Sequence, residues 1–145
     1  MEWPKIAEVS YPTLKGEHRT INQAIEQDLS SRSDEFPIRE DLVIQALSDE
    51  VGAEMIPFLV ERFRCDLQMH LEGVIGAVSS ADGEQLERES HTLKSVSGTF
   101  GAVRLQRQMT EINECCRRGE FKRALELAEN VKAVGQLTMD AYLKD

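Results

Sequence analysis

Apolar residues recur at three- and four-residue steps from Pro37 onward, the spacing that lines one face of an α-helix. The clearest stretch follows Pro57, which suits the first turn of a helix, and continues to about Ser79. Residues 80–83 form a turn, and a second long helix then runs to about Thr99. The buried side of this second helix is predicted to carry Leu86, Leu93, Val96 and Phe100.

Gly101 interrupts the pattern, and a third stripe then runs from Ala102 to a stop at Gly119. The last helix begins near Glu120 and reaches about Ala141. A shorter helix around 42–47 precedes all of these and closes near Gly52. No segment alternates like a strand. The pattern predicts an all-α fold: an antiparallel up-down-up-down four-helix bundle with a short N-terminal helix capping one end.

The first 37 residues differ from the rest of the chain, because prolines at 4, 12 and 37 and a polar run at 30–34 interrupt them. Thr20 can cap one short helix with Ile21, Ile25 and Leu29 on one face. We therefore expect an N-terminal arm or linker at 1–37, with room for one short helix. The bundle is expected at 38–145.

His91 is the most informative residue of the chain. At about 100° per residue it lies roughly 160° from the middle of its helix's apolar stripe, beside Lys94, Ser95 and Gly98. A glycine on an exposed helix face lowers helix stability by about 1 kcal/mol relative to alanine, so Gly98 needs a reason. Because Gly98 is expected to face outward, we favour access to the imidazole as that reason over close helix packing. Lys94, one turn along, can stabilise a negative group on the ring. This arrangement indicates a histidine that carries a phosphoryl group; the alternative is a solvated surface residue.

The run 89–102 resembles the signature of histidine-containing phosphotransfer domains, usually written His-x-Leu-Lys-Gly-Ser-Ser/Ala-x-x-x-Gly-Ala. The direct matches are His91, Leu93, Lys94, Ser97, Gly101 and Ala102. Ser95 stands where glycine is commonest and is still small, while Val96 replaces a small polar residue and faces inward. The likeness extends from about Ile38 to Leu143.

The resemblance implies a phosphorelay intermediate of two-component signalling. His91 would accept a phosphoryl group from an aspartate of one receiver domain and pass it to another, in a hybrid sensor kinase or a response regulator. Lys94 would stabilise the phosphoryl charge. No cofactor is expected on the chain, because the receiver would bring Mg²⁺. The residues expected to surround His91 in partner docking are Glu84, Glu87, Arg88, Ser95 and Gly98.

Composition narrows the function further. The net charge of −9 and the lack of a basic patch argue against nucleic acid. No apolar stretch approaches the ~18 residues of a membrane span and no signal-peptide pattern is visible, so we expect a cytoplasmic protein that does not bind membranes. A monomer is expected because the bundle closes its own core and leaves no apolar stripe over. Cys65, Cys115 and Cys116 lack metal-ligand spacing and are expected to be reduced; we predict no metal site.

The sequence contains no glycine-rich nucleotide loop and no Walker or kinase pattern. The chain is therefore expected to be a phosphocarrier without ATP binding or autokinase activity, and not an enzyme. One alternative is a helical adaptor that docks receiver domains without being phosphorylated. Another is the phosphotransfer module of a chemotaxis-type kinase, which would need domains for which 145 residues leave no room unless the chain is a fragment.

Overall fold

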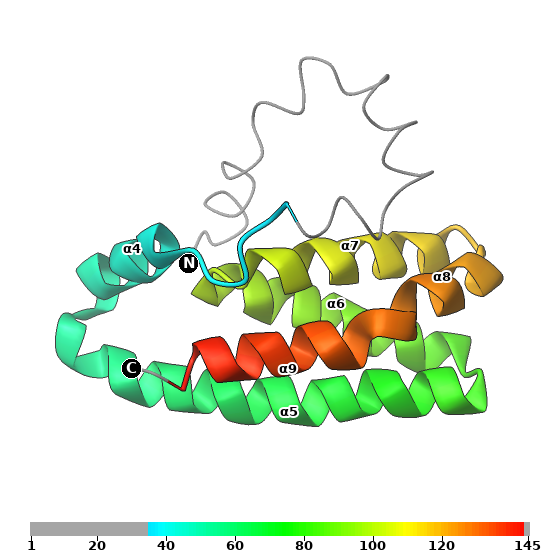
Figure 1. The fold of residues 1–145 in the computed structure, drawn as a ribbon, viewed down its shortest axis with the longest axis horizontal. Coiled ribbons are helices and arrows are strands. Elements are labelled where there is room, and N and C mark those ends of the chain that lie inside the picture. The colour runs from blue at the N-terminus through cyan, green and yellow to red at the C-terminus, as the bar shows by residue number, and fades with distance from the viewer. Residues whose placement is uncertain (1–34, 144–145) are drawn as a thin grey trace, which may run out of the picture.

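A computed structural model of the chain describes residues 35–143, which fold into an all-α bundle. The long helices are α5 (Ile56–Ser80), α6 (Gly83–Phe100) and α7 (Val103–Arg117). They are followed by α8 (Phe121–Leu127) and α9 (Val131–Ala141), and preceded by the shorter α4 (Asp41–Val51). Figure 1 shows α5, α6, α7 and the α8–α9 pair side by side, with α4 at one end.

Short connections make neighbouring helices antiparallel, as the sequence predicted. Ala81 and Asp82 join α5 to α6, and the Asp82 carboxylate caps α6 by accepting a hydrogen bond from the amide of Gln85 at 3.1 Å. Gly101 and Ala102 join α6 to α7. Pro57 lies in the first turn of α5, where its missing amide proton costs nothing.

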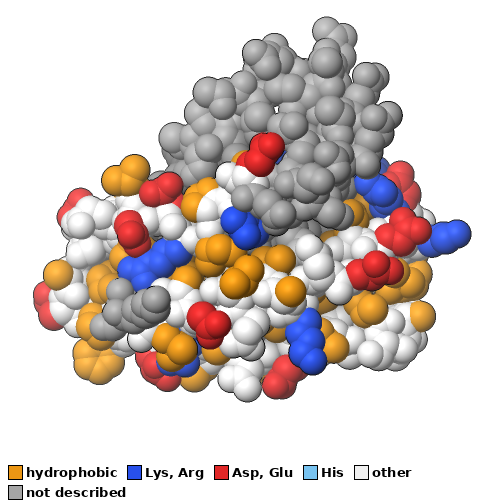
Figure 2. Space-filling view, in the orientation of Figure 1, with side chains coloured by type: hydrophobic (Ala, Val, Ile, Leu, Met, Phe, Trp, Pro, Cys, Tyr) orange, Lys and Arg blue, Asp and Glu red, His pale blue; other side chains and the backbone are white. Residues whose placement is uncertain are grey.

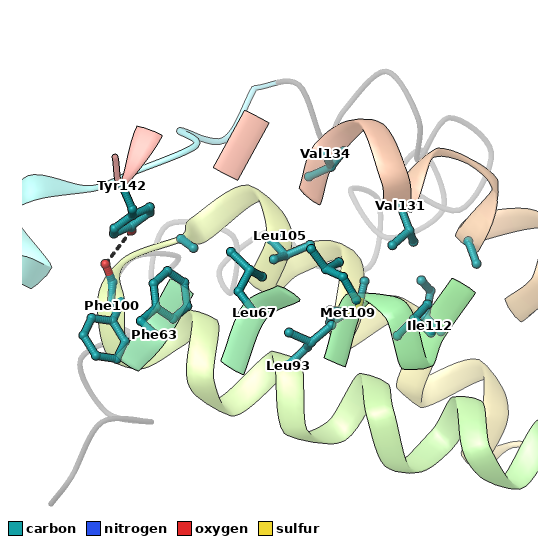
Figure 3. Close-up of a cluster of buried hydrophobic side chains, with 14 of the residues drawn as sticks. Phe63, Leu67, Leu93, Phe100, Leu105, Met109, Ile112, Val131, Val134 and Tyr142 are labelled. Atoms are coloured by element: carbon teal, nitrogen blue, oxygen red, sulfur yellow. Dashed lines mark hydrogen bonds between the residues drawn. The ribbon is translucent and has the colours of Figure 1, made fainter. Parts of the chain in front are cut away.

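The core lies between the four long elements and is filled mainly by aliphatic side chains. Phe63, Leu67 and Leu93 are fully buried. In Figure 3 these side chains lie beside Leu105, Met109 and Ile112 of α7, with Val131 and Val134 of α9 on another side. The predicted stripes of α5, α6 and α7 are thus confirmed as core.

An aromatic cluster closes the end of the core near α4. The rings of Phe63 and Phe100 stack with centroids 4.6 Å apart, and Tyr142 meets Phe63 edge-on at 4.8 Å. The buried Tyr142 hydroxyl donates a hydrogen bond of 2.6 Å to the carbonyl of Phe100 (Figure 3). This bond satisfies a polar group that would otherwise be costly to bury.

The last helix differs from the prediction, because it is not continuous. A 3-10 turn, η3 (Ala128–Asn130), separates α8 from α9. The buried Gln108 of α7 donates from Nε2 to the carbonyl of Leu127 at 3.3 Å and to the side-chain oxygen of Asn130. These two hydrogen bonds hold α7 against the 3-10 turn η3.

The spacing in the first short helix predicts an apolar face of Leu42, Val43, Ala46 and Leu47, and for Leu42 this is wrong. It is 76% exposed, whereas Val43, Ile44 and Leu47 are buried. The inward face of α4 is therefore turned by one residue relative to the predicted stripe.

Phe36 and Pro37 pack along the start of α7. The backbone amide of Arg104 donates to the Pro37 carbonyl at 2.9 Å, and its side chain donates to the Phe36 carbonyl at 2.8 Å. The helix predicted near Thr20 lies outside the described residues, and the proposed division at 37/38 stays a prediction.

Gly101 sits where no other residue fits well. Its φ is +78°, and a Cβ there would lie 2.6 Å from the carbonyl oxygen of Glu40. Gly101→Ala should therefore lower the free energy of unfolding by about 2–4 kcal/mol. Gly119→Ala is the control: it has the same φ but open space around it, and should cost only about 1–2 kcal/mol. Urea unfolding followed by circular dichroism measures both, and equal losses would contradict the role of the Glu40 contact.

Candidate functional site

His91 lies midway along α6 and its side chain is exposed. Within residues 35–143 no hydrogen bond or ion pair engages its imidazole, so both ring nitrogens are open to a partner there. The helix that carries it is held rigidly, since Leu86 and Leu93 on the opposite face are fully buried. The structure thus bears out the outward orientation predicted for His91.

Lys94 follows one helical turn after His91 and is half-buried. Residues three apart on a helix are neighbours on its surface, so the ammonium can approach a group bound to the imidazole. Intermediate burial is usual for a lysine, whose aliphatic part can cover apolar surface while the charged end stays in water.

Most of the predicted docking residues share the exposed face with His91. Glu84, Arg88 and Ser95 are exposed and lie on the same side of α6, and Glu87 is exposed on the flank toward α7. They present both signs of charge around the imidazole.

Gly98 is the exception, and the prediction of an exposed glycine beside His91 is wrong. Gly98 is buried. Three residues further on, Gly101 at the end of α6 meets the residue before α4: the Glu40 amide donates to its carbonyl at 2.7 Å. Gly98 therefore does not provide open clearance at the imidazole.

A polar contact between α6 and α7 was not foreseen. Asn113 of α7 is buried and donates from Nδ2 to the Glu87 carbonyl at 3.0 Å and to the Ser90 hydroxyl at 3.3 Å. Ser90 is itself fully buried directly before His91. These bonds fix the rotation of α6 about its axis, and so the direction in which His91 points. The signal in the sequence was an asparagine inside the apolar stripe of α7.

On its other flank α6 meets α5 through a second polar contact. His70 of α5 is partly buried and lies with Nδ1 2.6 Å from Oε1 of Glu89. Next to it in the sequence, Met69 is 58% exposed. Near this contact, α5 thus also presents an exposed apolar side chain.

The cysteines do not form a second reactive centre. Cys115 is buried, Cys116 is half-buried and Cys65 is exposed. Burial raises the pKa of the Cys116 thiol to about 11 and also raises that of Cys115. Both thiols are therefore protonated, and unreactive as nucleophiles, at neutral pH.

Within the described part of the chain, no three His, Cys, Asp or Glu side chains gather as metal ligands, and no helix is long and apolar enough to cross a bilayer. An exposed imidazole is a nucleophile when neutral, and a cation one turn away complements a phosphoryl group placed on it. An all-α bundle presenting such a histidine at the middle of a rigid helix belongs to the class of histidine phosphotransfer proteins.

Comparison with known proteins agrees with this class. The family model of the Hpt domain matches residues 59–143, and the chain belongs to this family. The chain is 34% identical over 103 residues to the phosphorelay protein LuxU of Vibrio vulnificus strain YJ016, covering 69% of this chain and 87% of that protein. It is 27% identical over 103 residues to LuxU of Vibrio harveyi, covering 68% and 87%.

A solved structure shares the fold. The crystal structure of the histidine-containing phosphotransfer protein HptB from Pseudomonas aeruginosa PAO1 superposes with a TM-score of 0.67 at 29% identity, covering 74% of this chain and 93% of that one. The family resemblance is confirmed. The chain is a histidine phosphotransfer intermediate of phosphorelay signalling, a class of phosphotransfer protein distinct from kinases.

Proposed function

We propose that His91 carries the phosphoryl group, accepting it from an aspartyl phosphate on one receiver domain and passing it to the aspartate of another. The observation that carries this proposal is the exposed imidazole at the middle of α6, with Lys94 one turn away. Such a carrier needs no nucleotide site of its own, because the phosphoryl group arrives already activated on the receiver.

The transfer step needs no reactant other than His91 and the phosphorylated receiver. The unprotonated ring nitrogen of His91 attacks phosphorus, the N–P bond forms, and the bond between phosphorus and the receiver's carboxylate oxygen breaks. The carboxylate leaves with the electron pair, and the ring loses its other N–H proton to solvent. Transfer onward is the same step reversed. Positioning and charge stabilisation do most of the work in phosphoryl transfer, which matches a site with few groups.

The docking surface is proposed to combine the charged face of α6 with Met69 of α5. Glu84, Arg88 and Ser95 lie around the imidazole, and Met69 is a flexible apolar side chain that adapts to different partners. Charges at the rim of an interface mainly set the association rate and partner choice. We expect transfer rates to fall with salt if the receiver surface is complementary.

The chain is proposed to act as a monomer. In Figure 2 the apolar side chains on the face over α9 are interrupted by charged ones. Between residues 35 and 143, the most exposed large apolar residues do not gather on one helix: they are Leu42 on α4, Phe58 and Met69 on α5, Leu137 on α9, and Leu143 after it. Sedimentation equilibrium tests this, and a dimer at micromolar concentration would contradict it.

The proposed function is tested by incubating the purified chain with a phosphorylated receiver domain and Mg²⁺. We expect acid-labile, base-stable phosphate, the stability pattern of phosphohistidine, located at residue 91 by mass spectrometry. A chain that binds several receivers but takes no label would instead be the non-phosphorylated adaptor.

Lys94→Ala should slow phosphoryl acceptance or shorten the lifetime of phosphohistidine by about 3–10-fold, because a half-exposed charge one turn away contributes roughly 1 kcal/mol. Lys132→Ala, which removes an exposed lysine from α9, is the control and should change neither quantity. The decay of labelled protein after removal of the receiver measures the lifetime. Identical rates and lifetimes in the two variants would show that Lys94 is only a surface charge.

A further inference from the structure

The helices α5 and α6 approach closely at Gly73. A Cβ atom on this glycine would lie 2.5 Å from Cδ and 2.6 Å from Oε2 of Glu89, so a side chain there would push the carboxylate out of its present position. The Glu89 carboxylate therefore fills the space that a side chain at position 73 would take. This explains a glycine in the interior of a helix, where it is otherwise destabilising.

The Glu89 carboxylate is held in place from α5. The His70 imidazole donates from Nδ1 to Oε1 of Glu89 at 2.6 Å, and the two side chains are only 23% and 22% exposed. Charge-assisted hydrogen bonds of this length are stronger than neutral ones, and partial burial reduces screening by water. Beside it, Nε2 of Gln85 donates to the Gly73 carbonyl at 3.2 Å. We call these four residues, His70, Gly73, Gln85 and Glu89, the α5–α6 clasp.

The clasp shares α6 with the histidine but does not touch it. Glu89 precedes His91 by two residues, which places the two side chains roughly 160° apart around α6. The clasp joins α5 to α6 at the height of Glu89, so its geometry sets how far apart the two helices lie near His91.

We propose that the α5–α6 clasp is a positioning device for receiver docking, which fixes the spacing between the His91 face of α6 and the neighbouring face of α5. This inference rests on the proposed function. A partner that contacts both helices at once recognises their separation, and small displacements at such sites change transfer rates strongly. Partly buried polar pairs also specify register between helices, beyond their contribution to stability.

Two glycines of α5 provide a matched test. Gly73→Ala puts a methyl group into the Glu89 carboxylate, whereas Gly76→Ala, one turn further along the same helix, meets nothing within 4 Å. Both changes raise helix propensity equally, so the difference between them isolates the clasp. Glu89→Gln is the second variant, since it keeps the size of the side chain and removes its charge; Glu72→Gln, at an exposed position of α5, is its control.

Each variant is assayed in two ways: labelling of residue 91 by the small donor phosphoramidate, and transfer from a phosphorylated receiver over a range of receiver concentrations. We expect Gly73→Ala to raise the half-saturating receiver concentration about 5–20-fold relative to Gly76→Ala, with labelling by phosphoramidate unchanged. Glu89→Gln should also raise the half-saturating receiver concentration relative to Glu72→Gln. This second variant keeps the test decisive if Gly73→Ala fails to fold.

Equal half-saturating concentrations in folded Gly73→Ala and Gly76→Ala proteins would overturn the role of the clasp. So would a loss of phosphoramidate labelling that matches the loss of receiver-dependent transfer, because the defect would then lie in the histidine and not in docking. A wild-type chain that takes no label from either donor would overturn the proposed function itself, and the inference with it.

Discussion

His91→Gln should abolish phosphoryl transfer, reducing labelling from a phosphorylated receiver by at least about 1,000-fold, to background. A glutamine amide has similar polarity but no nucleophilic ring nitrogen, so no N–P bond can form. Because His91 is exposed and packs against no part of the core, the bundle should remain folded. The variant thus separates chemistry from stability.

The measurement is receiver-dependent labelling with circular dichroism on the same samples. The chain contains three histidines, and His18→Gln serves as the control that should label normally. Full labelling of a folded His91→Gln protein would refute the central assignment. Receiver binding by His91→Gln with wild-type affinity is expected, since the docking residues are unchanged.

Leu93→Ala, two positions from the carrier histidine, should destabilise the fold and leave the chemistry of His91 intact. Leu93 is fully buried in the cluster with Leu67 and Met109, so its truncation removes apolar contacts and leaves a cavity. We expect a loss of about 2–5 kcal/mol in the free energy of unfolding. That is a large part of the ~5–15 kcal/mol of a typical domain.

Leu42→Ala is the same chemical change at a position that is 76% exposed, and it should alter stability by less than about 0.5 kcal/mol. Urea unfolding of both variants measures the difference. At low denaturant, the fraction of Leu93→Ala that remains folded should still accept phosphate on His91. Equal stability of the two variants would contradict the placement of Leu93 in the core.

The order of the helices and the outward direction of His91 could be predicted because both depend on local spacing alone. A three- or four-residue period marks the inward face wherever a helix packs on one side only. The period fails at two positions: Gly98, on the same face of α6 as His91, is buried, and Leu42 of α4 is exposed.

The interruption of the last helix leaves almost no trace in the sequence. Three residues in a 3-10 turn rotate only about 60° further than in an α-helix, so the apolar stripe continues through η3. The buried positions Ala124, Ala128, Val131, Val134 and Thr138 still follow three- and four-residue steps. Only the bonds from Gln108, on another helix, reveal the break.

The polar contacts beside the site could not be predicted for a similar reason. No spacing rule connects His70 with Glu89, or Ser90 with Asn113, because each pair joins two helices and depends on their relative rotation and height. The glycine at 73 was visible in the sequence, but its meaning appears only when Glu89 is seen against it.

The connection between α6 and α7 is only two residues long, Gly101 and Ala102, and this bears on the order in which the protein folds and opens. A hairpin of two adjacent helices closes with little loss of chain entropy, whereas α9 must return across the whole domain to reach Phe100. Segments that associate locally tend to form early and to be released late in native-state hydrogen exchange. We therefore expect the helix that carries His91 to belong to the unit that opens last, so that the carrier histidine keeps its setting when α8 and α9 open.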